Sequence, residues 1–175
     1  MEKRMRYITL HTSATQPSQD IGVREIRDWH VNGNGWSDIG YHEVLRRDGT
    51  WEKGRDPGRT GAHVGGHNSM NYGICLVGGI REGGSPSNPS DFEDNYTDAQ
   101  WKALYQRMLQ LHERWPDAII MGHNGFPGHE SRGCPCFDWK AWRADFLSSL
   151  KEEEVELPSH WIDEIDHDFR FKVLE

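Results

Sequence analysis

Two potential metal ligands, His123 and Cys134, flank one short loop that is rich in glycine and proline. Zinc binds histidine nitrogen and cysteine sulfur in tetrahedral geometry, and a catalytic zinc site usually has three protein ligands and leaves the fourth position to water. A third ligand is therefore needed. We select His11, because it ends an apolar run over residues 7–10, just as His123 follows a second apolar run over residues 118–121.

The two apolar runs have the length of short β-strands. If both strands enter one sheet in the same direction, their carboxyl ends share an edge, and open α/β sheets bind their ligands at this edge. The sequence therefore predicts a zinc site formed by His11, His123 and Cys134 at one edge of a sheet.

The order of the remaining segments predicts an α/β fold, with a mixed central β-sheet and helices packed on it. Hydrophobic periodicity and turn residues assign the segments. Strands are expected over residues 7–10, 41–46, 51–55, 73–80 and 118–121, and helices over residues 23–33, 97–115 and 138–150. Two helix starts have side-chain signals, because Thr97 and Gln100 form a capping-box pattern and Asp138 can cap the last helix.

Composition limits the classes of protein that remain. The chain has 175 residues and a formal net charge of -8, without the basic block that a general nucleic-acid binder requires. No apolar stretch approaches the length of a membrane span, and the first residues lack the apolar region of a signal peptide. We therefore expect a protein made in the cytoplasm, with one catalytic domain over residues 1–150 and an acidic, aromatic tail over residues 151–175.

The three cysteines are better explained by metal binding than by disulfides. Cys134 and Cys136 are separated only by Pro135, which is too short a spacing for an unstrained bridge. Cys75 lies in an apolar run and is expected to be a small buried side chain.

Four segments carry a family resemblance and follow one another in order: HTSATQPSQDIGVREIRDWH, DIGYHEVLRRDGTWEKGRD, GAHVGGHNSMNYGICLVGGI and GH…CPCFD. They resemble the zinc-dependent N-acetylmuramoyl-L-alanine amidases, in particular phage lysozymes of the coliphage T-seven type, whose fold is shared by peptidoglycan recognition proteins. The resemblance covers about residues 6–150. It implies a Zn²⁺ cofactor, a peptidoglycan substrate and cleavage of the amide between N-acetylmuramic acid and L-alanine.

Residue by residue, the resemblance implies that His11, His123 and Cys134 are the zinc ligands and that Tyr41 is the active-site tyrosine. A basic residue, often lysine in the phage enzymes, falls on Arg132. Because a guanidinium stays protonated at any working pH, Arg132 favours electrostatic stabilisation over acid/base catalysis.

The proton shuttle stays open between Tyr41, His129 and Glu130, of which the last two lie in a loop longer than that of the resembling phage enzymes. His63 is expected to line the substrate groove. His67 follows at a spacing that would suit a metal pair on a helix, but the surrounding glycines disfavour a helix, and we expect His67 to be structural.

The resemblance implies that the chain is a monomeric endolysin of a phage or prophage. It would be made in the host cytoplasm and would reach the cell wall from the periplasm through a holin. One alternative is a recognition protein that binds peptidoglycan without cutting it, which Cys134 disfavours because such proteins usually lose this ligand. A second role as a regulator that binds the phage RNA polymerase is also implied, although the segment before Arg6 is short.

Overall fold

A single mixed sheet forms the centre of the computed structural model, which describes residues 4–131 and 133–151. Its strands are β1 (Tyr7–Thr12), β2 (Glu43–Leu45), β3 (Trp51–Lys53), β4 (Asn71–Leu76) and β5 (Ile119–Gly122). Their order in the sheet is β3-β2-β4-β1-β5. All neighbouring pairs are parallel except β2 and β3, which form the antiparallel hairpin. The predicted α/β fold with a mixed central sheet is confirmed.

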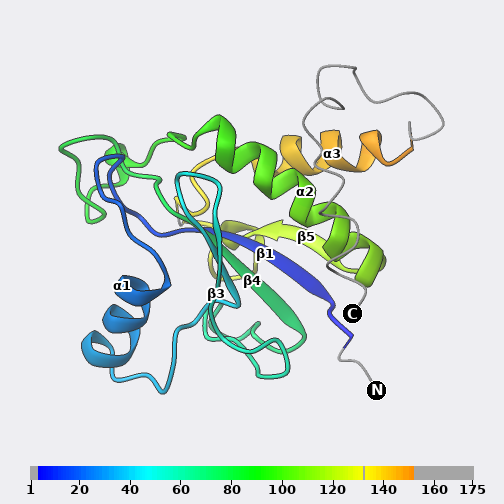
Figure 1. The fold of residues 1–175 in the computed structure, drawn as a ribbon, viewed down its shortest axis with the longest axis horizontal. Helices are drawn as coiled ribbons and strands as arrows, with labels where there is room; N and C mark the ends of the chain where they lie inside the picture. Colours follow the sequence, from blue (N-terminus) through cyan, green and yellow to red (C-terminus); the bar gives the residue numbers. More distant parts are fainter. Residues whose placement is uncertain (1–3, 132, 152–175) are drawn as a thin grey trace. The chain divides into compact units, whose positions relative to one another are not determined.

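Three α-helices accompany the sheet within the described residues: α1 (Val23–Asp28), α2 (Asp98–Arg114) and α3 (Trp139–Ser149). Three short helical turns complete the set, namely η1 (Trp29–Gly33), η2 (Pro89–Asp91) and η3 (His123–Gly125). The order of strands and α-helices along the chain is the predicted one. Helices α1 and α2 lie on opposite sides of the sheet (Figure 1).

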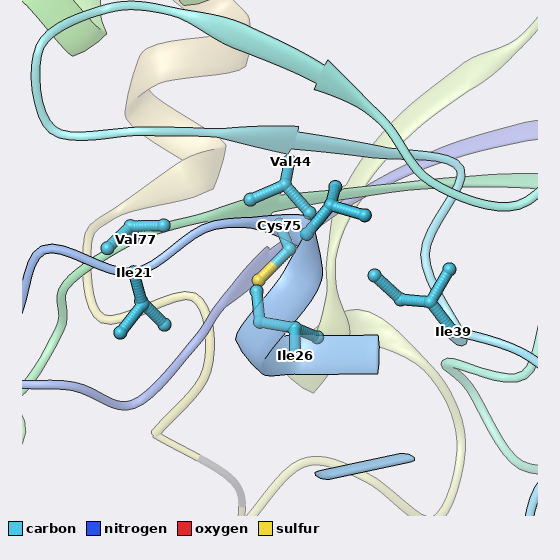
Figure 2. Close-up of a cluster of buried hydrophobic side chains, with 7 residues drawn as sticks. Ile21, Ile26, Ile39, Val44, Cys75 and Val77 are labelled. Atoms are coloured by element: carbon cyan, nitrogen blue, oxygen red, sulfur yellow. The ribbon is translucent and has the colours of Figure 1, made fainter. Parts of the chain in front are cut away.

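The face of the sheet that α1 covers has its own small apolar core (Figure 2). The core consists of Ile21, Val23, Ile26, Ile39, Val44, Cys75 and Val77, with Tyr41 packed against it. Cys75 is fully buried, as expected, and its side chain points toward Ile26 of α1 in Figure 2. Burial of these side chains fixes α1 and the segment before β2 against the strands that carry the site.

Helix α2 is held on the other face of the sheet by its N-terminus and by its apolar stripe. Thr97 and Gln100 form the expected capping box, with the Thr97 hydroxyl accepting from the Gln100 amide at 3.1 Å. The Gln100 side chain also donates to the carbonyl oxygens of Leu45 and Val77, which lie at the ends of β2 and β4. The stripe buries Leu104, Met108 and Leu111.

The parallel register aligns the ends of three strands at one edge. His11 of β1 is paired with Cys75 of β4, and Leu10 is paired with Gly122, the last residue of β5. His123 therefore leaves β5 beside His11, as the sequence predicted.

Strand β4 is displaced from its predicted range, since it begins two residues earlier and ends at Leu76. Gly78 and Gly79 have φ angles of 138° and 93°, values that other residues rarely adopt and that end the regular strand. A Cβ atom at Gly79 would overlap the Thr12 side chain. The glycine pair thus ends the strand and lets the chain pass close to the end of β1.

The predicted hairpin exists, but its regular strands are shorter than expected. Asp48 and Gly49 form the turn, in which the amide of Gly49 donates to Arg46 and Gly49 has a φ of 88°. Pairing continues beyond β2, because the amides of Gly54 and Arg55 donate to His42 and Tyr41 respectively. Tyr41 therefore sits just before β2 on a backbone that the hairpin holds.

The chain divides into two compact units, Met1–Ala141 and Trp142–Glu175, so the division falls inside α3. Asp138 caps this helix as expected, accepting from the amides of Lys140 and Ala141. The predicted tail over residues 151–175 lies outside the described residues except for Lys151. No helix in the described part of the chain has the length and apolar character that a membrane crossing needs.

Candidate active site at the carboxyl edge of the sheet

The three predicted ligands come together at the edge of the sheet. His11, His123 and Cys134 each offer one ligand atom, and these atoms lie within 4.8 Å of one another. The Nδ1 atom of His11 lies 3.7 Å from the sulfur of Cys134. Two nitrogens and one sulfur at this spacing fit the donor set of a tetrahedral zinc site with one position left over.

Cys134 reaches this position because the loop that carries it is closed at its base. The amide of Asn124, the residue after His123, donates to the carbonyl oxygen of Cys134 at 3.2 Å. The buried Tyr96 hydroxyl donates to the carbonyl oxygen of Pro135, which follows Cys134 through a cis peptide bond. The amide of Thr12 then donates to the Cys134 sulfur at 3.2 Å, a contact that stabilises a thiolate.

His11 is held from behind by His63. The His11 side chain is almost fully buried, and its Nε2 lies 3.0 Å from Nδ1 of His63. The Nε2 of His63 lies 3.2 Å from the carbonyl oxygen of Asn71. Gly73 makes this packing feasible, since a Cβ atom there would collide with the His63 ring.

His123 has a similar partner in the long loop. Its Nε2 lies 3.0 Å from Nδ1 of His129. The Nε2 of His129 lies 3.0 Å from the carbonyl oxygen of Gly65, on a segment far away in sequence. The loop that the sequence singled out as unusually long therefore contacts both a candidate ligand and the segment around Gly65.

A cavity of about 450 Å³ opens beside the cluster. Its lining residues are His30, Trp36, Tyr41, Ala62, His63, Gly65, Asn68, His123 and His129. The cavity brings together Tyr41, His63 and His129, three residues that the sequence associated with the site in addition to the ligands. Its aromatic and polar lining suits a substrate with both apolar and hydrogen-bonding groups.

Tyr41 lies against the metal cluster. Its ring centroid is 5.1 Å from that of His11 and 6.4 Å from that of His63. Tyr41 also hydrogen-bonds Cys75, and this bond opposes the strong rise in the pKa of the Cys75 thiol that burial causes. The buried apolar core and the cavity thus share this one side chain.

Burial biases two side chains near the cluster, His63 and Cys136, toward their neutral forms. Burial lowers the pKa of His63 to about 3, with His42 adding to the effect, so His63 is a neutral imidazole at physiological pH. Burial raises the pKa of Cys136 to about 11, so this thiol stays protonated near neutrality. His42 is buried and accepts from the Gly73 amide, in agreement with its predicted packed position.

The remaining predicted residues fall in different places. Arg132 lies outside the described residues. Of the three candidates for the proton shuttle, Tyr41 and His129 line the cavity beside the ligands, whereas Glu130 lines a separate cavity with Asn124 and residues 137–140. Backbone amides, including that of Gly128, lower the pKa of the exposed Glu130 carboxyl and keep it ionised.

Sequence reasoning missed the aromatic and polar side chains of His30, Trp36 and Asn68, which also line the cavity. His30 accepts from the amide of Gly40 and its ring contacts both Trp36 and Tyr41. Burial lowers the pKa of His30, which favours its neutral form. The spacing of His30 from Ile26 fits an ordinary helix face and by itself does not indicate a site. The one signal for His30 was its place at the end of the first motif of the family resemblance.

The comparisons with known proteins agree with this geometry. The N-acetylmuramoyl-L-alanine amidase family matches residues 1–137. The endolysin of Klebsiella phage KP32 is 45% identical over 135 residues, covering 77% of this chain and 83% of its own. The endolysin of Escherichia phage T7 is 43% identical over 137 residues, with the same two coverages of 77% and 83%.

Solved structures extend the likeness to the fold. The Ph2119 endolysin from the Thermus scotoductus MAT2119 bacteriophage Ph2119 has a TM-score of 0.63 at 27% identity, covering 81% of this chain and 84% of that one. Drosophila peptidoglycan recognition protein SD has a TM-score of 0.61 at 18% identity, covering 77% and 76%, and this likeness concerns the fold alone.

Fold, site and relatives together define a peptidoglycan-degrading protein of the phage type. The chain belongs to the N-acetylmuramoyl-L-alanine amidase family. The predicted family and the predicted class of activity, peptidoglycan hydrolysis, are confirmed.

Proposed function

We propose that the chain is a zinc-dependent amidase in which His11, His123 and Cys134 hold the metal. The observation that carries this proposal is the approach of their three ligand atoms to within 4.8 Å at the edge of the sheet. The Thr12 amide supports it further, because an N–H group aimed at the Cys134 sulfur favours the thiolate that binds zinc. The site lies beside a cavity large enough for part of a muropeptide.

Hydrolysis of an amide requires a nucleophile, an electrophile and a group that stabilises the developing oxyanion. Zinc, when bound, lowers the pKa of water toward about 7 and polarises a carbonyl. The chain's own contribution is to fix the ligand positions, to exclude bulk water from a partly buried cavity and to present donors to the substrate. Charge that develops on the amide oxygen is then stabilised by preorganised donors.

Tyr41 and Arg132 are the donors that we propose. The phenol of Tyr41 lies beside His11 and lines the cavity, so it can donate a hydrogen bond to a substrate oxygen there. Arg132, two residues before Cys134 in the sequence, adds a permanent positive charge in the same loop. His63 completes the proposed set as a residue of the cavity wall that substrate approaches.

The cellular role that we propose is that of an endolysin, as the phage relatives are named. The catalytic domain spans residues 1–150, and the tail over residues 151–175 is dispensable for catalysis. The protein is made in the host cytoplasm, acts as a monomer, and reaches the wall from the periplasm through a holin. Binding to the phage RNA polymerase stays a prediction from the family resemblance.

The bond that is cut can be identified directly. Purified peptidoglycan is digested with the full chain, and the soluble products are analysed by mass spectrometry. Free stem peptides that begin with L-alanine, together with intact glycan strands, support the proposal. Products with cut glycan bonds, or peptides cut within the stem, would overturn it. A chain that binds peptidoglycan in a pelleting assay but releases no peptide would support the non-catalytic alternative.

A further inference from the structure

Each of the two candidate histidine ligands contacts a second histidine, which in turn contacts a backbone carbonyl. On the β1 side the series runs from His11 through His63 to the carbonyl oxygen of Asn71, with distances of 3.0 and 3.2 Å. On the loop side it runs from His123 through His129 to the carbonyl oxygen of Gly65, with two distances of 3.0 Å. The same atoms are used in both series, Nε2 of the first ring and Nδ1 of the second.

The carbonyl oxygens set the direction of both series, because a carbonyl can only accept a hydrogen bond. The Nε2 atoms of His63 and His129 must therefore carry the hydrogen. In a neutral imidazole the other nitrogen is then an acceptor, so Nδ1 of each ring accepts from Nε2 of its ligand histidine. If the ligand rings are neutral, Nδ1 of His11 and of His123 then carries no hydrogen and can act as a metal ligand.

An independent distance agrees with this assignment. The atom of His11 that faces Cys134 is Nδ1, at 3.7 Å from the sulfur. The hydrogen bonds and the ligand cluster thus select the same nitrogen for metal binding. A ligand histidine commonly donates its second ring N–H to a fixed acceptor, which sets the tautomer, the ring orientation and the basicity of the ligand.

We propose that His63 and His129 are positioning residues, which hold His11 and His123 in the tautomer that presents Nδ1 to the metal. This inference rests on the proposed zinc site. It assigns His129, a residue of the long loop between His123 and Cys134, a function of its own. It also gives His63 a second task besides forming the cavity wall.

His129 further ties the loop to the segment around Gly65. The loop carries Cys134, and its middle residues at 127, 128, 130 and 131 are exposed. The bond from His129 to Gly65 is therefore a restraint on a segment that burial alone does not fix. Loss of this restraint should loosen both His123 and the Cys134 end of the loop.

The test compares two substitutions of His129 in the full chain. His129→Leu keeps a bulky side chain but removes the acceptor. His129→Asn keeps an acceptor oxygen near the place of Nδ1. The control is His67→Ala, which removes a neighbouring histidine whose ring lies 6.2 Å from His129 and contacts Phe126.

Zinc affinity is measured for each protein by competition with a chromogenic chelator. We expect His129→Leu to weaken zinc binding by about 10- to 100-fold, the range typical for outer partners of metal ligands. His129→Asn should recover part of the loss, and His67→Ala should change the affinity by less than about two-fold. Equal affinity for wild type and His129→Leu, or equal loss in the Leu and Asn variants, would overturn the proposal.

A second readout reports the tautomers without any activity. Long-range ¹H–¹⁵N correlation spectra of histidine-labelled protein distinguish an Nε2–H ring from an Nδ1–H ring. We expect His11 and His123 to be Nε2–H in the zinc-loaded wild type. An Nδ1–H signal for either ligand would contradict the proposal, while a wild type that binds no zinc at all would reject the zinc site itself.

Discussion

The two histidine pairs of the site have the same pattern of contacts but lie in different kinds of structure, one in the sheet and one in a loop. On the β1 side, His11 and His63 are 1% and 8% exposed and lie among strands whose register is fixed. On the loop side, His123 leaves a strand end and its partner His129 lies in a segment with exposed neighbours. A buried sheet edge fixes a ligand by packing, whereas a loop must fix one by individual hydrogen bonds. The difference predicts which substitutions harm the fold and which harm only the site.

The largest effect is expected from the ligands themselves. His11→Ala or Cys134→Ser should abolish the binding of one zinc per chain and lower the hydrolysis of muropeptides by on the order of 10³-fold or more, because the Lewis acid and the acidified water are lost together. Elemental analysis measures the metal. Full zinc content in Cys134→Ser would reject the ligand set.

Cys136→Ser is the matched control for the cysteine ligand. Cys136 lies two residues further along, and burial raises the pKa of its thiol to about 11, so it is a poor source of thiolate. The substituted protein should keep its zinc and most of its activity. Loss of the metal in this variant would mean that the wrong cysteine was assigned.

A smaller effect on turnover is expected from Tyr41→Phe. The change removes one hydroxyl and leaves the ring beside His11, so zinc content should be unchanged while turnover falls on the order of 100-fold, as for other oxyanion donors. The assay uses a soluble muropeptide and follows peptide release. Normal turnover in Tyr41→Phe would assign the phenol a structural role through its bond to Cys75.

The two sides should differ most in how far substitution of the second histidine lowers the free energy of unfolding. His63→Ala should lower the free energy of unfolding by about 2–4 kcal/mol, because it opens a cavity beside Gly73 and removes the contact between the buried Nε2 of His11 and Nδ1 of His63. His129→Ala should cost only about 0.5 kcal/mol, since its surroundings are largely exposed. Denaturant unfolding of the metal-free proteins measures both, and equal losses would contradict the comparison.

The smallest effect is expected at the C-terminus. Truncation after Leu150 removes no candidate ligand and keeps α3 up to its last residue, Ser149. The shortened chain should fold, bind one zinc and hydrolyse soluble muropeptides within about two-fold of the full chain, in the range expected for changes away from packed regions. Circular dichroism and zinc analysis check this, and a truncated chain that fails to fold would place the tail inside the catalytic domain.

The same contrast explains what the sequence could and could not predict. Residues 7–10 and 118–121 have a clear apolar pattern, and the parallel pairing of such strands brings His11 and His123 to one edge. The capping signals at Thr97 and Asp138 are local, and they also held. The proximity of His11 and His123 could therefore be predicted from residue type and strand order.

The supporting contacts were not accessible in this way. The bond between His63 and His11 spans 52 positions, and the bond between His129 and Gly65 spans 64. Neither contact leaves a local pattern in the sequence, because the path of the loops determines which distant residues come into contact. The ends of β4 were also missed, since the positive φ angles of Gly78 and Gly79 accompany close approaches to distant groups, such as that of Gly79 to Thr12 at the end of β1.

Anomalous diffraction at the zinc absorption edge, from crystals of the full chain, is the measurement that tests the central claim most directly. We expect one peak per chain, at bonding distance from Nδ1 of His11, Nδ1 of His123 and the sulfur of Cys134. A peak bonded through Nε2 of either histidine would contradict the positioning roles of His63 and His129. A peak elsewhere in the molecule would contradict the zinc site at the edge of the sheet.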